Sequence, residues 1–145
     1  MKDTRTNQYL GVAGELRVMS ELVLRGFNPA KSYLDHGIDL ILDNGKTVQV
    51  KTASKFKNTH NGSSYYHYAV GGRYSLKNGE RKVKVSTPVD FYIFWCVDEN
   101  HFYIIPSEVV KSRSGKTTYF QIDVYPTSPQ QRGRYESYKN NWDIL

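Results

Sequence analysis

The chain has 145 residues and a formal net charge of +6 at neutral pH. That length is typical of a single domain, here residues 1–145, with room for a substantial hydrophobic core. No segment approaches the roughly 18 consecutive apolar residues that a membrane helix needs. The polar N-terminus lacks the apolar stretch of a signal peptide. We therefore expect a cytoplasmic protein with no membrane partner.

One cysteine, Cys96, lies inside the apolar run 91–97. A single cysteine cannot form an internal disulfide, and this one is expected to be a small buried hydrophobic residue. No spacing of cysteine and histidine matches a zinc site. These observations argue against a disulfide scaffold and against a zinc-binding domain.

Residues 6–25 carry the pattern of a helix with an apolar stripe. The apolar side chains recur at helical spacing, at Val12, Leu16, Met19 and Val23. Thr6 is placed to cap the N-terminus, and Gly26 is placed to end the helix.

Short apolar or alternating segments, separated by turn residues, predict the strands. Strands are expected at 29–33, 38–42, 47–52, 101–105 and 118–124, and a strand buried on both faces at 89–97. Residues 55–64 are expected to form a loop, and 65–85 a hairpin with Asn78 and Gly79 at its tip. Further helices are expected at 107–112, with Ser107 as N-cap, and at 133–144. This order of elements predicts an α/β (α+β) fold with a mixed central sheet flanked by helices.

The positive charge is concentrated in one segment. Residues 51–84 hold eight basic side chains and a single acid, Glu80, whereas the segments on either side are nearly neutral. The eight are Lys51, Lys55, Lys57, Arg73, Lys77, Arg81, Lys82 and Lys84, and the segment also contains Tyr65, Tyr66, Tyr68 and Tyr74. Basic and aromatic side chains together are typical of a nucleic-acid surface. The alternative is a solvated hairpin that binds nothing.

The stretch GIDLILDNGKTVQVKTAS, residues 37–54, contains two apolar strands that each carry polar side chains. A two-residue turn would mix polar and apolar side chains on both faces, which a sheet with a core side does not tolerate. A three-residue loop at 43–45, with Gly45 in the left-handed conformation, instead sets Leu40 opposite Val48 and Ile38 opposite Val50. We therefore predict the three-residue loop.

That register gathers Asp39, Gln49 and Lys51 on one patch. Asp39 can bind a hard divalent cation, and the carbonyl oxygen of Gln49 can complete the coordination. Lys51 can orient or help deprotonate an attacking water, or stabilise charge on a phosphate. The alternative is a solvated outer face with an exposed ion pair.

Glu15 strengthens the first interpretation. It lies four residues before Met19 and seven before Leu22 and so continues a buried stripe, where a carboxylate is costly unless it is paired or binds a metal. The alternative for Glu15 is an edge position that reaches solvent.

These motifs resemble those of the PD-(D/E)XK nuclease superfamily. The matching stretches are GVAGE in the first helix, GF at its end, GIDLI and VQVK, followed by VDFYIFWCVDENHFYIIPSEVV. The likeness covers most of the chain and is loosest over 55–85 and 113–133. Within the superfamily the chain is most similar to archaeal Holliday junction resolvases and to a bacterial group I intron homing endonuclease. The resemblance implies a restriction-endonuclease-like core with a basic hairpin insertion at 55–85.

Carried over by position, the resemblance implies a role for each site residue. Asp39 would be the direct metal ligand, with Glu15 and the backbone carbonyl of Val50 completing the metal shell. Gln49 stands at the D/E position of the motif, and Lys51 is the motif lysine. Gln49 replaces an acid, which removes one negative charge and should weaken the binding of divalent metal. Glutamine is an accepted variant in the homing-endonuclease branch, so activity is still expected.

The sequence thus predicts a Mg²⁺-dependent endodeoxyribonuclease, with Mn²⁺ as a substitute ion, that hydrolyses phosphodiester bonds in double-stranded or branched DNA. One such site cuts one strand, so a homodimer or homotetramer is expected. Three hypotheses remain: a sequence-specific homing enzyme, a Holliday junction resolvase, and an inactive DNA-binding module on a nuclease fold.

DNA is expected to contact the basic segment. The residues predicted to bind it are Lys55, Lys57, Arg73, Lys77, Arg81, Lys82 and Lys84. Asp35 and His36, just before the site, are weaker candidates for substrate contact, as are His60 and His67 in the basic segment.

Overall fold

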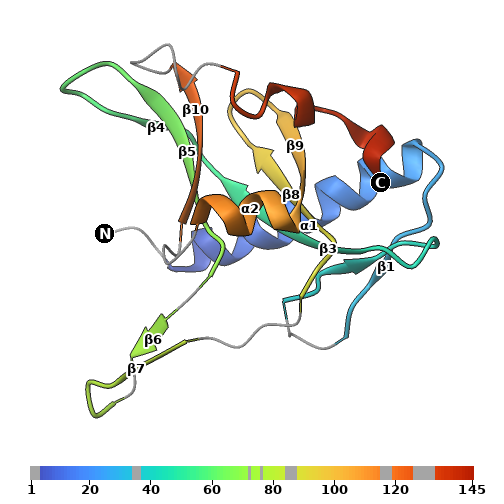
Figure 1. Ribbon diagram of the computed structural model, residues 1–145, viewed down its shortest axis with the longest axis horizontal. Helices are drawn as coiled ribbons and strands as arrows, with labels where there is room; N and C mark the ends of the chain where they lie inside the picture. The colour runs from blue at the N-terminus through green and yellow to red at the C-terminus, as the bar shows by residue number, and fades with distance from the viewer. Residues whose placement is uncertain are drawn as a thin grey trace.

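The computed structural model describes residues 4–33, 37–71, 73–75, 77–83, 88–114, 119–125 and 133–145. A long helix, α1 (Thr4–Leu24), packs against a five-stranded sheet, and a second sheet and a protruding hairpin complete the arrangement (Figure 1). The predicted α/β class is confirmed. Within these residues, none of the helices has the length and apolar character needed to cross a membrane.

The prediction is correct for the C-terminal end of α1 and wrong for its N-terminal end. The helix begins at Thr4, so Thr6 lies inside it and is not the N-cap. Its C-terminal end is set by Gly26, which has a φ of 90°. The amides of Gly26 and Phe27 donate to the carbonyls of Val23 and Leu22. These two hydrogen bonds form a Schellman motif, which needs the left-handed conformation that glycine adopts without strain.

The face of α1 that packs on the sheet differs from the face that its apolar spacing suggests. Val18 and Leu22 are fully buried, whereas Val12, Leu16 and Val23 are exposed. The helix therefore has two apolar faces. A helical pattern alone could not tell which of them the sheet covers.

The central sheet has the strand order β1-β2-β3-β8-β9. The strands are β1 Ala30–Lys31, β2 Leu40–Ile41, β3 Thr47–Ala53, β8 Phe91–Cys96 and β9 His101–Pro106. β3 and β8 run parallel, and the other neighbouring strands are antiparallel. The predicted mixed sheet is therefore confirmed.

Two cores lie on opposite sides of this sheet, and β8 contributes alternate side chains to each of them. The helix-side core contains Val18, Leu22, Leu40, Leu42, Val48, Val50, Phe91, Ile93, Phe102, Ile104 and Trp142. The aromatic core contains Tyr66, Tyr68, Val89, Tyr92, Phe94, Cys96, Tyr103, Ile105, Val110, Phe120 and Ile122. The prediction that the 89–97 strand is covered on both faces is confirmed, as is the burial of Cys96.

The β2–β3 hairpin has the predicted three-residue loop. The Leu42 amide donates to the Lys46 carbonyl at 2.8 Å, and the Gly45 amide donates to the Leu42 carbonyl at 2.9 Å. Gly45 has a φ of 84°, and Leu40 pairs with Val48. The hydrophobic pattern therefore selected the correct loop length.

Ile38 departs from the predicted register. It lies before β2 and packs against the aromatic core, whereas Val50 belongs to the helix-side core. The prediction that Ile38 and Val50 share a face is therefore wrong. The pairing of β2 with β3 begins at Leu40, and just before it the Asp39 amide donates to the Val48 carbonyl while the Asp39 carboxylate accepts the Val50 amide.

A second sheet, of order β10-β5-β4, lies on the side of the aromatic core. Its strands are β10 Tyr119–Tyr125, β5 Ser64–Ala69 and β4 Phe56–Lys57. β10 corresponds to the strand predicted over 118–124 and lies at one edge of this sheet. The prediction of an unbroken loop over 55–64 is wrong, because β4 pairs there with β5.

The hairpin predicted over 65–85 is shorter than expected. It consists of β6 (Arg73–Ser75) and β7 (Arg81–Val83), with Gly79 at its tip at a φ of 84°. β5, which was expected to be its first strand, pairs with β10 and β4 instead. The β6–β7 hairpin projects away from both larger sheets (Figure 1, lower left).

The second helix, α2, spans Ser107–Ser114, and Ser107 is its first helical residue. The Ser107 hydroxyl donates to the carbonyl of Val89, which ties the helix to the chain just before β8. Its predicted role as an N-cap is therefore wrong.

The predicted closing helix over 133–144 is also wrong. Two short 3-10 helices are present instead, η2 Glu136–Tyr138 and η3 Trp142–Ile144. Between them Asn140 adopts a φ of 50°, which no helix continues through, and donates its amide to the Phe102 carbonyl at 2.6 Å. Trp142 of this segment is buried in the helix-side core.

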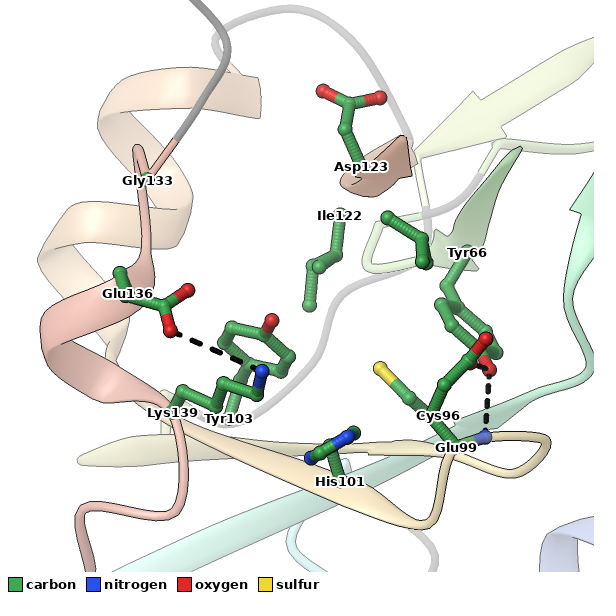
Figure 2. A pocket seen from close by; sticks show the side chains of 11 residues that line it. Tyr66, Cys96, Glu99, His101, Tyr103, Ile122, Asp123, Gly133, Glu136 and Lys139 are labelled. Atoms are coloured by element: carbon green, nitrogen blue, oxygen red, sulfur yellow. Dashed lines mark hydrogen bonds and ion pairs between the residues drawn. The ribbon is translucent and has the colours of Figure 1, made fainter. Parts of the chain in front are cut away.

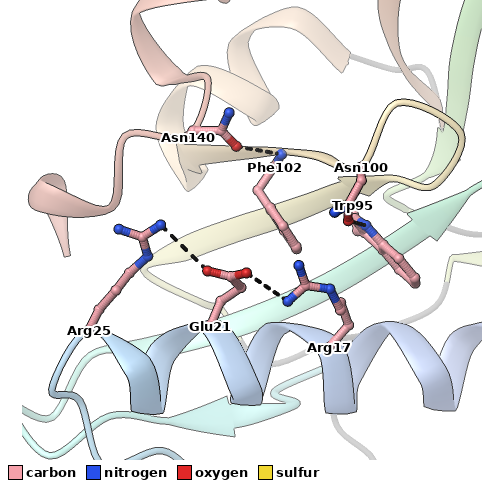
Figure 3. A network of polar contacts seen from close by, with 7 residues as sticks. All are labelled: Arg17, Glu21, Arg25, Trp95, Asn100, Phe102 and Asn140. Carbon is pink, nitrogen blue, oxygen red and sulfur yellow. Dashed lines mark hydrogen bonds and ion pairs between the residues drawn. The ribbon is translucent and has the colours of Figure 1, made fainter.

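A set of polar contacts holds α1 against β9 and the C-terminal segment (Figure 3). Glu21 accepts ion pairs from Arg17 at 2.7 Å and from Arg25 at 3.4 Å. The same two guanidinium groups lie over aromatic rings, Arg17 over Phe102 at 5.1 Å and Arg25 over Trp142 at 4.9 Å. These contacts join α1 to β9 and to the C-terminal segment.

Candidate functional site

Asp39 is held by its own carboxylate on the side of β3 that faces β2, which we call the Asp39 edge. Its Oδ2 atom accepts the amide of Val50 at 2.7 Å, and its amide donates to the carbonyl of Val48 at 2.9 Å. Its carbonyl accepts the amide of Ser32 at 3.0 Å. Asp39 therefore lies alongside the segment of β3 whose middle residue is Gln49, and it is only half-buried.

The backbone of Val50 presents both of its polar groups to this edge. In an extended strand, the N–H and C=O of one residue point to the same side. Because the Val50 amide points to Asp39, its carbonyl oxygen lies on the Asp39 side of β3 as well. A side-chain oxygen and a backbone oxygen are thus brought to one edge.

Gln49 and Lys51 occupy the face of β3 opposite to Val48 and Val50. Both are half-buried, and their neighbours in the parallel strand β8 are Tyr92 and Phe94. The apolar strand β8 lies along one flank of these two residues.

Glu15 approaches the same edge from α1. The helix can come close there because Gly14 has no side chain: a Cβ at this position would lie 1.7 Å from Thr52 Oγ1. Glu15 Oε2 lies 3.1 Å from Lys31 Nζ, yet this oxygen is buried and makes no hydrogen bond. The Lys31 ammonium is near enough for an ion pair, so this oxygen has an electrostatic partner although it accepts no hydrogen bond.

Lys31 connects Glu15 to the Asp39 edge. It belongs to β1 and pairs with Leu40, which follows Asp39 directly. Ser32, the next residue, bonds to the Asp39 carbonyl. Glu15 is therefore linked to the Asp39 edge through Lys31, whereas Gln49 and Lys51 lie on the face of β3 opposite to Val48 and Val50. Sequence reasoning did not single out Lys31, whose position in a charge-balanced segment gave no signal.

The donor set at this edge fits a hard divalent cation. The carboxylates of Asp39 and Glu15, the amide oxygen of Gln49 and the carbonyl of Val50 are all oxygen ligands of the kind that Mg²⁺ prefers. The buried oxygen of Glu15 that lacks a hydrogen bond is what such a cation would satisfy. Among the described residues, His, Cys, Asp and Glu side chains do not form any group of three that could hold a metal. Any metal bound here would therefore depend on Gln49 and on the backbone as well.

The residues predicted to bind DNA lie in two different settings. The ammonium of Lys55 is half-buried and pairs with Glu99 at 2.6 Å, so this residue already has a structural partner. Lys57 on β4 and Lys77 near the tip of the β6–β7 hairpin are exposed. Arg73, Arg81 and Lys82 belong to the two strands of that hairpin, and Lys84 lies outside the described residues.

The weaker candidates are scattered. Asp35 and His36 lie outside the described residues. His60 is exposed in the turn after β4, and His67 is exposed on β5, where its ring centroid lies 4.5 Å from that of Tyr119. Neither histidine touches the Asp39 edge.

A separate hollow of about 570 Å³ lies between β5, β9, β10 and η2 (Figure 2). Its charged lining includes Glu99, His101, Glu136 and Lys139. Burial, with Lys139 nearby, lowers the pKa of His101. The lining contains none of the predicted catalytic residues. Sequence analysis gave no hint of this hollow, because its walls come from distant segments.

The comparisons with known proteins agree with this architecture. The family model for the PD-(D/E)XK endonucleases matches residues 5–144. The chain belongs to the PD-(D/E)XK endonuclease family.

A solved structure, described as that of the bacterial homing endonuclease I-Ssp6803I, has the same fold as this PD-(D/E)XK chain. It superposes with a TM-score of 0.69 at 21% sequence identity, covering 94% of this chain and 90% of the other. A search of curated proteins gave no match. PD-(D/E)XK nucleases in general use divalent metal ions, and the oxygen donors around Asp39 are of the type that such ions need.

Proposed function

We propose that this PD-(D/E)XK chain is a divalent-metal-dependent endonuclease that hydrolyses phosphodiester bonds of DNA, with its active site at the Asp39 edge of β3. The observation that supports it most directly is the buried oxygen of Glu15 that makes no hydrogen bond, next to an edge that also holds Asp39 and the carbonyl of Val50. The Lys31 ammonium lies 3.1 Å from that oxygen as an ion pair but makes no hydrogen bond to it, so a divalent cation would give the carboxylate a second partner.

In this proposal each residue has a distinct task. The carboxylates of Asp39 and Glu15, the amide oxygen of Gln49 and the carbonyl of Val50 would hold the cation, with Mg²⁺ as the natural ion and Mn²⁺ as a substitute. A bound divalent cation would supply positive charge at the scissile phosphate and a more acidic water. The Val50 amide keeps the Asp39 carboxylate in one orientation. Lys51 would donate hydrogen bonds to the attacking water or to the phosphate, and so stabilise the charge that develops there.

The direct test is a cleavage assay with plasmid and linear DNA, with and without Mg²⁺. The wild type should cleave only with the metal. Asp39→Ala should not cleave, but it should still bind DNA in Ca²⁺, since the basic surface is intact. Asp43→Ala is the matched control, because Asp43 is an exposed carboxylate in the loop of the same hairpin. Cleavage by Asp39→Ala at the wild-type rate would remove Asp39 from the mechanism.

A homing-type activity on duplex DNA is the form that we favour. Support comes from the fold shared with I-Ssp6803I and from Gln49 at the position of the motif acid. The projecting β6–β7 hairpin, rich in arginine and lysine, has a shape that suits contact with a DNA groove (Figure 1).

Holliday junction resolution is the second candidate, favoured by the GVAGE sequence in α1. The two are separated by comparing cleavage of a four-way junction with cleavage of linear duplexes of random sequence. A resolvase would cut the junction regardless of sequence, whereas a homing enzyme would cut only a rare duplex site.

A further inference from the structure

The outer face of the second sheet carries a row of aromatic rings that contact one another from strand to strand. Alternate residues of a strand point to opposite faces, and the other face of this sheet packs on the aromatic core. The ring centroids lie 5.0 Å apart for Phe56 and Tyr65, and 6.3 Å apart for Tyr65 and His67. His67 and Tyr119 lie 4.5 Å apart. We call these four residues the ring row.

The ring row crosses the sheet from one edge strand to the other. Phe56 on β4 pairs with Tyr65 at one end of β5, and Tyr119 on β10 pairs with Ala69 at the other end. Phe56 is 52% exposed and Tyr119 is 54% exposed, so both ends of the row are open to solvent. His67 between them is exposed as well. Exposed rings in mutual contact are a feature of interaction surfaces.

The other side chains of this face suit the edges of nucleobases. Gln121 pairs with His67 across the strands, and Asp123 pairs with Tyr65. The Gln121 amide donates to the Asp123 carboxylate at 2.7 Å, so donor and acceptor groups lie beside the rings. The centre of a protein–protein interface is depleted of charged side chains, whereas a nucleobase has a flat aromatic face and polar edges. A row of rings with polar neighbours therefore fits bases.

The charges around the ring row complement a phosphate backbone. At one end, the exposed Lys57 follows Phe56 directly on β4. At the other end, β5 finishes at Ala69 and the chain continues into the β6–β7 hairpin, whose first residue is Arg73 (Figure 1). Basic groups thus follow both ends of the row, where the phosphates of a crossing strand would pass. Membership of a nuclease family makes nucleic acid the polyanion that this chain is expected to meet.

We propose that the ring row is a stacking platform for the unpaired bases of single-stranded DNA. Every base has a flat aromatic face that can stack on an exposed ring, so such a platform tolerates any sequence. In a duplex these faces are covered by the neighbouring base pairs, so the platform selects unpaired bases. The platform goes beyond the proposed cleavage activity, because it uses none of the residues at the Asp39 edge.

The experiment measures binding of the full chain by fluorescence anisotropy, in EDTA so that cleavage plays no part. The probes are an oligothymidine of about 12 nucleotides and a mixed-sequence duplex of the same length. Phe56→Leu and Tyr119→Leu should each weaken binding of the single strand by about fivefold or more and change duplex binding by less than about twofold. Leucine keeps an apolar side chain on these edge strands but removes the ring.

Tyr9→Leu is the matched control, since it removes an aromatic ring that is 71% exposed on α1, away from this sheet. It should bind both probes like the wild type. Circular dichroism should show the native fold for every variant.

Two further measurements separate stacking from other effects of these substitutions. Phe56→Trp and Tyr119→Trp should keep or strengthen binding of the single strand, because the larger indole ring still stacks. Phe56→Leu should leave the slope of log affinity against log salt concentration unchanged, because it removes no phosphate contact.

Three results would overturn the platform. They are single-strand binding by Phe56→Leu and Tyr119→Leu at the wild-type affinity, an equal loss of duplex and single-strand binding, and tryptophan variants as weak as the leucine variants. The first would mean that these rings only pair across the strands of the sheet. None of these readouts involves catalysis. A protein that binds single strands through the ring row but cleaves no DNA would instead contradict the proposed nuclease function and leave the platform intact.

Discussion

The carboxylate of Asp39 replaces a backbone partner for Val50: Oδ2 accepts the Val50 amide at 2.7 Å, at the point where the β2 ladder has ended. The Asp39 side chain thus completes the hydrogen bonding of the sheet and is also the proposed cation ligand. This double role means that the loss of charge and the loss of the hydrogen bond can be separated by mutation.

Asp39→Asn should keep the hydrogen bond and lose the charge. We expect unfolding free energy close to that of the wild type and no detectable metal-dependent cleavage. Asp39→Ala should lose both, and its unfolding free energy should fall by about 1.5–3 kcal/mol, the usual value of a hydrogen bond to a charged group. Denaturant titration and a cleavage assay measure the two effects. Equal stability of the two variants would mean that the Val50 contact contributes nothing to the fold.

Gln49→Glu should tighten the binding of divalent metal, because it adds a negative charge at the same position in β3. The affinity can be measured by calorimetric titration with Mn²⁺ or Ca²⁺ without DNA. Gln121→Glu is a suitable control, since Gln121 is an exposed glutamine on β10, in the other sheet. If Gln49→Glu and the control bind metal equally, Gln49 does not contact the ion.

The two glycines of the GVAGE sequence should respond in opposite directions to alanine. At Gly14 a Cβ would lie 1.7 Å from Thr52 Oγ1, so Gly14→Ala must push α1 off β3 and should cost about 1–3 kcal/mol of unfolding free energy. At Gly11 nothing lies within 4 Å, so Gly11→Ala should raise stability by up to about 1 kcal/mol through helix propensity. Thermal or denaturant unfolding distinguishes them. A neutral Gly14→Ala would show that the close approach of α1 to β3 is not required.

The β6–β7 hairpin should carry much of the affinity for DNA. Each phosphate contact adds about 0.9 to the slope of log affinity against log salt concentration on duplex DNA. Replacing Arg73, Lys77, Arg81 and Lys82 by glutamine should therefore flatten that slope by up to about 3–4 per subunit. Binding is measured in Ca²⁺ to suppress cleavage.

The control for the hairpin variant replaces two exposed basic residues from other elements, Lys111 on α2 and Arg134 before η2. It should leave the slope nearly unchanged. If the hairpin variant and the wild type share one slope, DNA is held elsewhere and the hairpin is only a solvated surface.

Asp90 should make the fold sensitive to acid. The backbone amide of Thr47 donates to its carboxylate at 2.9 Å, and together with the Thr47 hydroxyl and Lys46 it lowers the pKa of Asp90. A lowered folded-state pKa means that the stabilisation is present above the ordinary aspartate pKa of about 3.9 and is lost as pH falls below it. The stability difference between the wild type and Asp90→Ala should therefore shrink as pH falls through that range. A difference that stays constant down to acid pH would contradict this.

The local elements of this chain were largely predictable, because their signals are short-range. The turn at Gly45 and the helix end at Gly26 each follow from a glycine at a position that needs φ above zero, and β8 follows from an unbroken apolar run. The pairing of Leu40 with Val48 followed from the alternation of side chains alone. In each of these cases a few neighbouring residues contain the information.

The predictions that proved wrong concern features that are determined by contacts between residues distant in the sequence. α1 buries the face with Val18 and Leu22, and its Arg17 and Arg25 lie over rings from β9 and the C-terminus, contacts that the sequence pattern cannot show. Ile38 lies before β2 and packs against the aromatic core, which the alternation of side chains did not indicate. The aromatic residues of 133–144 suggested a helix, but Asn140 at positive φ interrupts it. The neighbourhood of Lys31 and Glu15 likewise depends on how α1 sits over β1.

The parallel pairing of β3 with β8 also has a kinetic consequence. Thr47 and Asp90, which bond across the start of this pair, are 43 positions apart in the chain. Closing that loop costs conformational entropy, and this cost comes before the centre of the sheet can form. The domain therefore belongs with proteins that have many non-local contacts and fold more slowly. The cost rises only with the logarithm of loop length, by about 0.6 kcal/mol per doubling. The tip of the β6–β7 hairpin could therefore be lengthened or exchanged at little cost to stability, so that the surface proposed to meet DNA can change length while the sheet beneath it stays the same.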